Sequence, residues 1–425
     1  MRIHILGISG TFMAGLAILA KQKGHTVTGS DKNFFDPMKT VLRENKIEIY
    51  KGYNPKILNE KIDLVIVGNV MSRGMPIIEK LLQSRIRYMS GPQWLKENIL
   101  VNKKVIAVSG THGKTTVSSL ITHILKSNKI NPSYLIGGLP IGFKKPANLT
   151  QSEYFVIEAD EYDTAFFDKR SKFIHYMPEI LIINNIEFDH ADIFDDIGDI
   201  LKNFHQLVRT IPKNGHIIYN ESDQNIKELL TKGVWSQLTA LKNTHWKNPK
   251  FRTNLLGVHN FKNIAISIIA CKKLSLPIKK IFDSIKSFKG VKRRMEHIAC
   301  FKKINIYDDF AHHPTAVLGS IKALQNRKSN KKTLSICQIR SNSMIRGTHT
   351  SKLYKALEHC DYSIIHHDKK SKVKFKTNKT KNINAFTTDK EISNYIKQLK
   401  KEIDTILIMS NGNTSNMIKL IKDAI

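Results

Sequence analysis

A twelve-residue stretch near the end of the first quarter of the chain places the tightest limits on its fold. Residues 105–116 read Val-Ile-Ala-Val-Ser-Gly-Thr-His-Gly-Lys-Thr-Thr, and a helix-like segment follows at 117–125. An apolar β-branched run, a glycine loop and a helix in this order predict a phosphate-binding loop. Glycines let backbone N–H groups approach a polyphosphate, and the helix turns its positive end toward it.

The loop departs from the full Walker pattern, because Val108 occupies the first glycine position and Gly110 supplies a tighter version. We expect Lys114 to reach the terminal phosphates of a nucleotide and the Thr115 hydroxyl to bind Mg²⁺. The other residues expected to line the phosphates are Gly110, Thr111, His112, Gly113 and Thr116. The alternative is an ordinary glycine-rich turn between a strand and a helix.

Strands alternate with helices in three blocks of the chain, and this alternation predicts parallel, doubly wound sheets of the α/β class. Residues 234–255 and 369–381 are rich in lysine and other polar residues, so we expect loops there. The strands expected in the three blocks are 2–6, 26–29 and 63–67; 155–158, 180–184 and 216–219; and 304–308, 333–339, 362–366 and 405–409.

The first block opens with a glycine-containing turn between its first strand and a helix expected over 12–23. The turn is similar to a dinucleotide-binding fingerprint, but Ser9 and Phe12 occupy two of its three glycine positions, which disfavours a nicotinamide enzyme. A nucleotide diphosphate could still rest on this turn, and a plain Rossmann-like turn is the alternative. The residues expected to contact the ligand are Gly10, Thr11, Ser30 and Asp31.

Acidic residues follow two strands of the second block. Glu158 begins the run Glu-Ala-Asp-Glu-Tyr-Asp, and His190 lies among the acidic residues of 184–192. Carboxyl ends of parallel strands lie beside the phosphate loop in doubly wound folds, and carboxylate oxygens suit Mg²⁺. We therefore expect Thr115, Glu158 and His190 to hold magnesium, with an acidic helix cap and a structural histidine as the alternatives.

Two further motifs stand at helix starts. Asn260 and Asn263 could read an adenine edge with their amides, although helix capping by Asn260 explains the pattern equally well. Residues 308–315 read Asp-Asp-Phe-Ala-His-His-Pro-Thr, and their adjacent histidines fit no common zinc site. Contact of this segment with a nucleotide ribose or phosphate is the better interpretation.

The chain carries a formal charge of +32, from 68 Lys and Arg against 36 Asp and Glu. The lysines are scattered and we find no nucleic-acid-binding motif, so we expect a phosphate-rich small ligand and no nucleic-acid partner. The apolar N-terminal segment is interrupted by glycines, unlike a signal peptide, and no segment is apolar for long enough to span a bilayer. Four separated cysteines fit a reducing compartment, so we expect a cytoplasmic protein without a membrane partner.

Taken in order, these motifs resemble the Mur ligase family, the ATP-dependent amide ligases of peptidoglycan synthesis. The matching segments are 110–116, 158–161, 185–190, 259–263, 293–294 and 308–315. The resemblance implies three domains: a Rossmann-like UDP-sugar domain at 1–102, a central P-loop ATPase domain at 103–290, and a Rossmann-like C-terminal peptide-substrate domain at 291–425.

Within the family, the resemblance favours the branch that joins the recycled tripeptide L-Ala-γ-D-Glu-meso-diaminopimelate to UDP-N-acetylmuramate. The stretches 89–95, 162–173, 189–196 and 340–342 carry this preference. It implies ATP and Mg²⁺ as cofactors, an acyl-phosphate intermediate, a monomer, and Lys114, Glu158 and His190 at the catalytic centre. The alternatives are the ligase that adds L-alanine to the same sugar nucleotide and a degraded, non-catalytic nucleotide-binding relative.

The resemblance also implies roles for residues of the third block. Asp309 and His312 are expected to reach ATP. Arg293 or Arg294 is expected to interact with charged groups at a hinge. Gln338 departs from the family pattern, which has an acidic residue there, and 413–416 replace a glycine-rich run. The candidates for binding the carboxylates of the peptide are Arg340, Ser341, Asn342, Ser410 and Asn411.

Overall fold

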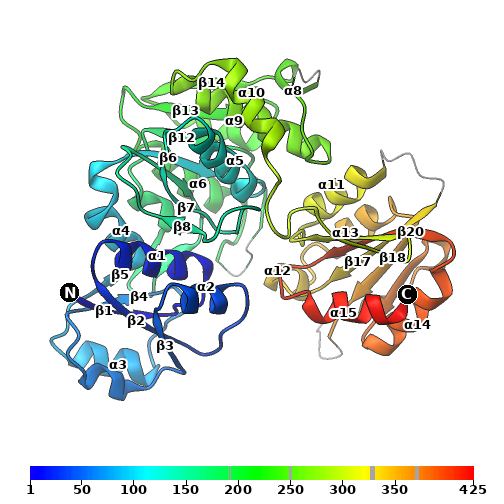
Figure 1. Cartoon of the computed structure of the whole chain (residues 1–425), viewed down its shortest axis with the longest axis horizontal. Coiled ribbons are helices and arrows are strands. Elements are labelled where there is room, and N and C mark those ends of the chain that lie inside the picture. The colour runs from blue at the N-terminus through cyan, green and yellow to red at the C-terminus, as the bar shows by residue number, and fades with distance from the viewer. Residues whose placement is uncertain (190, 192, 248–250, 326–330, 369–372) are drawn as a thin grey trace. The chain divides into compact units, whose positions relative to one another are not determined.

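The computed structural model describes residues 1–189, 191, 193–247, 251–325, 331–368 and 373–425 of the 425-residue chain. Three large sheets follow one another along the sequence, coloured blue, cyan to green, and yellow to red in Figure 1. The chain forms two compact units, and the first contains the first two sheets. The first unit comprises Met1–Glu187, Ile197–Thr253 and Asn263–Lys289, and the second comprises Phe188–Asp196, Asn254–Lys262 and Gly290–Ile425.

The first sheet is parallel throughout. Its strands are β1 (Arg2–Leu6), β2 (Thr26–Asp31), β3 (Glu48–Lys51), β4 (Leu64–Val67) and β5 (Tyr88–Ser90). Its helices are α1 (Thr11–Gln22), α2 (Met38–Glu44), η1 (Pro55–Asn59), α3 (Pro76–Gln83), α4 (Gly91–Asn98) and η2 (Leu100–Asn102). The strand order β3-β2-β1-β4-β5 reverses at β1, and ligands of such sheets bind where the order reverses, outside the carboxyl ends of the strands.

The second sheet has seven strands, and all but one of its neighbouring pairs are parallel. The strands are β6 (Lys104–Ser109), β7 (Ser133–Leu135), β8 (Ala147–Asn148), β9 (Tyr154–Glu158), β12 (Ile180–Ile183), β13 (His216–Asn220) and β14 (Gln237–Leu241). Their order is β14-β13-β12-β6-β9-β7-β8, with β7 and β8 antiparallel. The strand β6 is central in the sheet, which explains its run of buried apolar residues over Val105–Val108.

The second sheet is accompanied by helices and a small ribbon. The helices are α5 (Lys114–Ser127), α6 (Ile197–Val208), α7 (Gln224–Thr231), α8 (Thr244–Lys247), α9 (Val258–Lys273) and α10 (Ile278–Ser287). The ribbon pairs β10 (Asp163–Ala165) with β11 (Asp168–Ser171) and leads into η3 (Lys172–His175). The expected loop at 234–255 is wrong in part, because β14 and α8 lie in it; β14 is a half-exposed edge strand whose pairing with β13 outweighs its polar composition.

The two sheets of the first unit are joined through α1. Gln22 Nε2 donates to Asn148 Oδ1 at 3.0 Å, beside β8. A Cβ on Gly15 would lie 2.3 Å from Leu135 Cδ1, so a larger residue would require the helix or the Leu135 side chain to shift. The turn before α1 and the phosphate loop therefore belong to one compact body.

The third sheet lies in the second unit and has helices packed on both faces. Its strands are β15 (Glu296–Phe301), β16 (Ile304–Asp309), β17 (Lys332–Gln338), β18 (Tyr362–His366), β19 (Ile383–Phe386) and β20 (Ile403–Met409). Its helices are α11 (Pro314–Gln325), α12 (Asn342–Ile345), α13 (Thr350–Leu357), η4 (Lys379–Lys381), α14 (Asp389–Leu399) and α15 (Ser415–Ala424). The order is β15-β16-β20-β17-β18-β19, antiparallel only at β15.

Successive side chains along the strands of the third sheet point to opposite faces, and this separates its two apolar clusters. Leu334 and Ile336 of β17 pack with Ile421 of α15, while Cys337 packs on the other face with Leu353 of α13. The predicted α/β class and every strand expected from the sequence are confirmed. Of the predicted loop at 369–381, residues 369–372 lie outside the described part, and η4 occupies its end. In the described ranges we find no helix with the length and hydrophobicity needed to cross a membrane.

A buried histidine makes the stability of the first sheet depend on pH. The ring of His4 in β1 is fully buried, with its nitrogens 2.8 Å from Thr28 Oγ1 and 3.1 Å from Ser30 Oγ. Burial lowers the pKa of His4 to about 4, so the unfolded chain takes up this proton at higher pH than the folded chain. We expect the free energy of unfolding to fall by about 3 kcal/mol through His4 as the pH falls from 6.5 to about 4.

Urea denaturation over this pH range, for the natural protein and His4→Gln, measures this effect. Glutamine can keep both hydrogen bonds but does not titrate, so the stability of the variant should fall less steeply with acid. Equal slopes for the two proteins would contradict a buried neutral His4.

Candidate active site

The phosphate loop between β6 and α5 depends on two glycines with positive φ. The φ angles are +124° at Gly110 and +83° at Gly113. A Cβ on Gly113 would lie 2.5 Å from both Asn184 Nδ2 and Asn263 Oδ1, so no larger residue fits. Gly113 is the N-cap of α5, and no side chain caps the helix. The first N–H groups of α5 therefore face the loop, an arrangement that binds anions.

Three asparagine amides brace this loop. Asn185 Oδ1 accepts from His112 N at 2.7 Å, and Asn185 Nδ2 donates to His112 O at 3.0 Å. Asn184 Nδ2 donates to His112 O and to Asn263 Oδ1, both at 2.9 Å. The predicted residue Asn263 is thus brought to the loop. Asn184 and Asn185 were not predicted as site residues, although two amides directly after an apolar strand are a usable signal.

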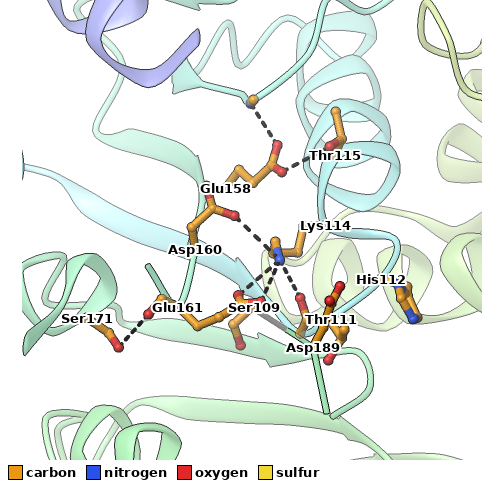
Figure 2. Close-up of polar contacts among 12 residues, drawn as sticks. Ser109, Thr111, His112, Lys114, Thr115, Glu158, Asp160, Glu161, Ser171 and Asp189 are labelled. Atoms are coloured by element: carbon orange, nitrogen blue, oxygen red, sulfur yellow. Dashed lines mark hydrogen bonds and ion pairs between the residues drawn. The ribbon is translucent and has the colours of Figure 1, made fainter. Parts of the chain in front are cut away.

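Lys114 lies buried at the start of α5, between two carboxylates (Figure 2). Its Nζ donates to Gly110 O at 2.7 Å and lies 3.0 Å from Glu161 Oε2 and 3.4 Å from Asp160 Oδ1. Burial acts to lower the pKa of Lys114, but the negative charges of Glu161 and Asp160 outweigh it and raise this pKa above its ordinary value. Lys114 is therefore a fixed cation at the loop.

Glu158 and Thr115 lie above Lys114 in Figure 2 and present two oxygen-bearing groups to each other. Thr115 Oγ1 donates to Glu158 Oε1 at 3.0 Å, and Gly137 N donates to Glu158 Oε2 at 2.7 Å. A hydroxyl and an oriented carboxylate beside a phosphate loop are the hard oxygen ligands that Mg²⁺ prefers, so Thr115 and Glu158 fit this ion. The predicted third ligand, His190, lies outside the described residues.

The turn after β1 is a second feature of the first unit that is suited to binding an anion. Gly10 is the N-cap of α1, and here too no side chain caps the helix. Asp31 Oδ2 accepts from Ser9 N at 2.9 Å and Ser9 Oγ at 2.6 Å, and Tyr53 OH donates to Asp31 Oδ1 at 3.0 Å. Ser9, at a fingerprint glycine position, thereby ties the turn to the end of β2.

The residues predicted to contact the sugar nucleotide lie at different depths. Gly10 is exposed and Thr11 half-buried, so both are accessible to a ligand. Ser30 is buried: its hydroxyl lies 3.1 Å from the His4 ring, and its carbonyl accepts from Gly7 N at 2.9 Å. Ser30 therefore supports the turn from beneath.

In the second unit, Arg293 and Arg294 flank one aromatic ring. Their guanidinium carbons lie 5.3 and 4.8 Å from the centroid of the Phe310 ring. Arg293 Nη2 donates to Ser410 O at 2.7 Å, and Arg293 Nε lies 3.2 Å from Asp308 Oδ2. Arg293 thus links the ends of β16 and β20.

Asp309 and His312 follow β16. Asp309 accepts from Met295 N at 2.6 Å and Ala311 N at 2.7 Å, and burial raises the pKa of Asp309 to about 6. Its carboxylate therefore orders the loop in which His312 stands. His312 Nε2 lies 3.9 Å from Asp189 Oδ2 within the same unit.

The two asparagines predicted to read adenine are divided between the units. Asn263 belongs to the first unit, and Asn260 lies in the part of α9 assigned to the second. Asn260 Nδ2 donates to Leu256 O at 2.7 Å. Adenine recognition by this pair stays a prediction.

The residues predicted for the peptide gather where β17 and β20 end side by side. Arg340 lies against Gly412, where a Cβ would be 2.5 Å from Arg340 Cδ. Asn342 begins α12 and is exposed, whereas Ser410 is fully buried. Within the described ranges, three buried atoms here have no hydrogen-bond partner: Gln338 Oε1, Ser341 Oγ and Asn411 Oδ1. Such atoms are costly unless a ligand satisfies them, so this edge is suited to polar groups of a substrate.

Three family models match the chain in an order that follows the three sheets. The model described as "Mur ligase family, catalytic domain" matches residues 2–102. "Mur ligase middle domain" matches residues 108–239, and "Mur ligase, glutamate ligase domain" matches residues 293–412.

Named relatives are similar over most of the chain. The UDP-N-acetylmuramate–L-alanyl-γ-D-glutamyl-meso-2,6-diaminoheptandioate ligase of Escherichia coli K12 is 44% identical over 382 residues, 85% of this chain and 84% of that protein. The protein of the same name from Haemophilus influenzae is 44% identical over 380 residues, 84% of each. The UDP-N-acetylmuramate–L-alanine ligase of Clostridium acetobutylicum is 30% identical over 449 residues, 97% of this chain and 95% of that protein.

Solved structures agree with this pattern. A murein peptide ligase from Psychrobacter arcticus has a TM-score of 0.76 and 35% identity, covering 100% of this chain and 98% of its own. A UDP-N-acetylmuramate–alanine ligase from Thermotoga maritima has a TM-score of 0.79 with the same coverage, but at 18% identity it supports the fold alone.

Proposed function

Because the chain belongs to the Mur ligase family, we propose that it joins UDP-N-acetylmuramate to the tripeptide L-Ala-γ-D-Glu-meso-diaminopimelate at the expense of ATP. The observation that carries this choice is the 44% identity to the Escherichia coli ligase named for that tripeptide. Identity to the Clostridium acetobutylicum ligase named for L-alanine is 30%. The phosphate loop, Lys114 and the Thr115–Glu158 pair supply the groups that an ATP-dependent ligase needs.

A carboxylate is a poor acyl donor, so the first step activates it. The lactyl carboxylate oxygen of the sugar nucleotide attacks the γ-phosphorus of ATP, giving an acyl phosphate and ADP. Lys114 and the N–H groups at the start of α5 stabilise negative charge on the transferring phosphoryl group. Thr115 and Glu158 would hold a Mg²⁺ ion, whose charge neutralises phosphate oxygens when it is bound.

In the second step, the α-amine of the tripeptide attacks the acyl carbon, the amide forms and phosphate leaves. An α-amine has a pKa of about 8, so it loses a proton at neutral pH at little cost and a general base is not strongly demanded. We assign the edge formed by Arg340, Ser341 and Asn411 to the carboxylates of the peptide, because its buried polar atoms suit them. Exclusion of water would protect the acyl phosphate from hydrolysis.

The proposed substrates are anionic small molecules, which suits a chain with a net charge of +32. ATP and Mg²⁺ are the proposed cofactors. We place the protein in the cytoplasm as a monomer, with no nucleic-acid or membrane partner.

A phosphate-release assay tests this function. The protein is supplied with ATP, Mg²⁺ and UDP-N-acetylmuramate, and then with the tripeptide, L-alanine or neither. We expect release only with an amine substrate, and a kcat/KM at least about tenfold higher for the tripeptide. A preference for L-alanine would reassign the chain to the L-alanine-adding branch, and no release with either amine would indicate a non-catalytic nucleotide-binding protein.

A further inference from the structure

Lys172 is a buried cation that the reaction above does not use. The residue is 9% exposed, and in the described part of the chain its ammonium forms neither a hydrogen bond nor an ion pair. Its Nζ lies 5.5 Å from the centroid of the Phe12 ring and 5.6 Å from that of Tyr162. Aromatic faces attract a cation but accept none of its three N–H bonds well. Lys172 is largely buried, and the described part of the protein leaves the donors of its ammonium unused, which points to an anionic ligand.

The backbone around Lys172 is firmly placed at the end of the ribbon. Lys172 N donates to Tyr162 O at 2.9 Å. The preceding hydroxyl, Ser171 Oγ, donates to Glu161 O at 2.7 Å, as Figure 2 shows. The following residue, Phe173, is fully buried in the core. Lys172 is therefore held in position before a ligand arrives, which favours binding.

Lys172 lies between the two anion-binding features of the first unit. The Phe12 ring that it contacts is in the first turn of α1, directly after the exposed turn at Gly10. The ribbon that carries Lys172 continues from the acidic segment 158–161, which surrounds Lys114. A group bound by Lys172 is thus near both the turn expected to hold the sugar nucleotide and the residues around the phosphate loop.

A second buried polar group adjoins the same aromatic ring. The Tyr176 ring stacks on Phe12, with centroids 6.5 Å apart and an interplanar angle of 24°. Tyr176 is fully buried, and its hydroxyl has no hydrogen-bond partner within the described ranges. Burial raises the pKa of Tyr176 well above its ordinary value, so its hydroxyl keeps its proton and can donate. The ammonium and this hydroxyl are two donors suited to an anion.

The carboxylates nearest Lys172 are engaged elsewhere. Asp163 lies 2.7 Å from the exposed Lys169, while Asp160 and Glu161 pair with the lysine of the phosphate loop. Burial lowers the pKa of Lys172, and the charges of these three carboxylates act in the opposite direction. They favour the charged form of Lys172 without occupying its donors.

We propose that Lys172, assisted by the Tyr176 hydroxyl, binds the lactyl carboxylate of the sugar nucleotide and directs it toward the phosphate loop. This assignment rests on the proposed function, because the lactyl carboxylate belongs to the proposed sugar substrate. The proposal also assigns a role to Phe12, which occupies a position where a dinucleotide fingerprint has glycine. The Phe12 ring forms a wall of the carboxylate site.

The test compares two sugar nucleotides that differ in this carboxylate. UDP-N-acetylglucosamine lacks the lactyl group of UDP-N-acetylmuramate, and calorimetry gives the affinity of each for the natural protein, Lys172→Met and Lys169→Met. Methionine keeps the length and the contacts with both rings but removes the charge. We expect Lys172→Met to bind UDP-N-acetylmuramate about 10- to 100-fold more weakly and UDP-N-acetylglucosamine within about twofold of the natural protein. The exposed control, Lys169→Met, should change neither affinity.

Stability and a second variant separate this role from a structural one. Because Lys172→Met removes a buried, unpaired charge, its thermal midpoint without ligand should equal or exceed that of the natural protein. Tyr176→Phe should also fold normally, since the lost hydroxyl has no partner, and should weaken UDP-N-acetylmuramate selectively by a few-fold.

Two results would overturn the assignment of Lys172 alone. In the first, Lys172→Met keeps the preference of the natural protein for UDP-N-acetylmuramate. In the second, Lys172→Met loses the same affinity for both sugar nucleotides, which would mean that Lys172 serves the acidic residues around Lys114. If the natural protein itself shows no preference, the proposed sugar substrate fails, and the carboxylate site with it.

Discussion

Replacement of Lys114 by alanine is expected to reduce amide-forming turnover by at least about 10³-fold while leaving the affinity for UDP-N-acetylmuramate within about twofold. Lys114 is the buried cation of the phosphate loop. In the proposed reaction, negative charge on the transferring phosphoryl group develops beside it. The turn at Gly10 follows a strand of the first sheet, and its structure does not depend on the Lys114 side chain. Phosphate release measures the first quantity and calorimetry the second. Unchanged turnover in Lys114→Ala would contradict the mechanism.

A double variant distinguishes the lost phosphate contact from a disturbed loop. Removal of Lys114 takes away the cation 3.0 Å from Glu161, which is 3% exposed, and a buried carboxylate that loses its cation destabilises the fold. Lys114→Met combined with Glu161→Gln removes both charges and should restore the thermal midpoint but not the turnover. Recovery of turnover in the double variant would mean that Lys114 serves mainly to neutralise Glu161.

The interior of the sheets could be predicted from the sequence because its signal is local. The strands β6 and β12 are buried on both faces, so they read as unbroken runs of apolar residues. The glycines of the phosphate loop likewise mark positive φ angles that few other residues adopt.

The edges of the sheets could not be read in this way. β14 is a five-residue strand with exposed polar residues, and its pairing with β13 is decided by the sheet and not by its own composition. The joining of the first two sheets was equally hidden, because it depends on the close approach of Gly15 to Leu135, which only the folded chain reveals.

For the candidate site, the sequence predicted residues that the structure brings together, but it did not predict the residues that hold them in place. Lys114, Thr115 and Glu158 were predicted from their motifs, and the structure brings them together. The sequence did not predict the bracing residues Asn184 and Asn185 or the buried Lys172. An amide or a lysine gives no signal in the sequence until its burial and its partners are known.

The second large effect is expected from Glu158→Gln, which should lower turnover by about 10²- to 10³-fold and raise the Mg²⁺ concentration needed for half-maximal rate. The amide can preserve the local geometry: its oxygen accepts from Gly137 N–H, and its NH₂ group donates to Thr115 Oγ1. The variant therefore removes a charge and little else. Its thermal midpoint without nucleotide should be close to that of the natural protein.

A Mg²⁺ titration of phosphate release, run beside the control Asp163→Asn, decides between a metal-binding and a structural role for Glu158. Asp163 follows in the same acidic stretch, but its partner is the exposed Lys169, so its loss should change the rate by no more than about twofold. If Glu158 binds the metal, added Mg²⁺ should recover part of the lost rate in Glu158→Gln. A rate that falls while the Mg²⁺ dependence stays as in the natural protein would mean that Glu158 only supports Thr115 and the loop at Gly137.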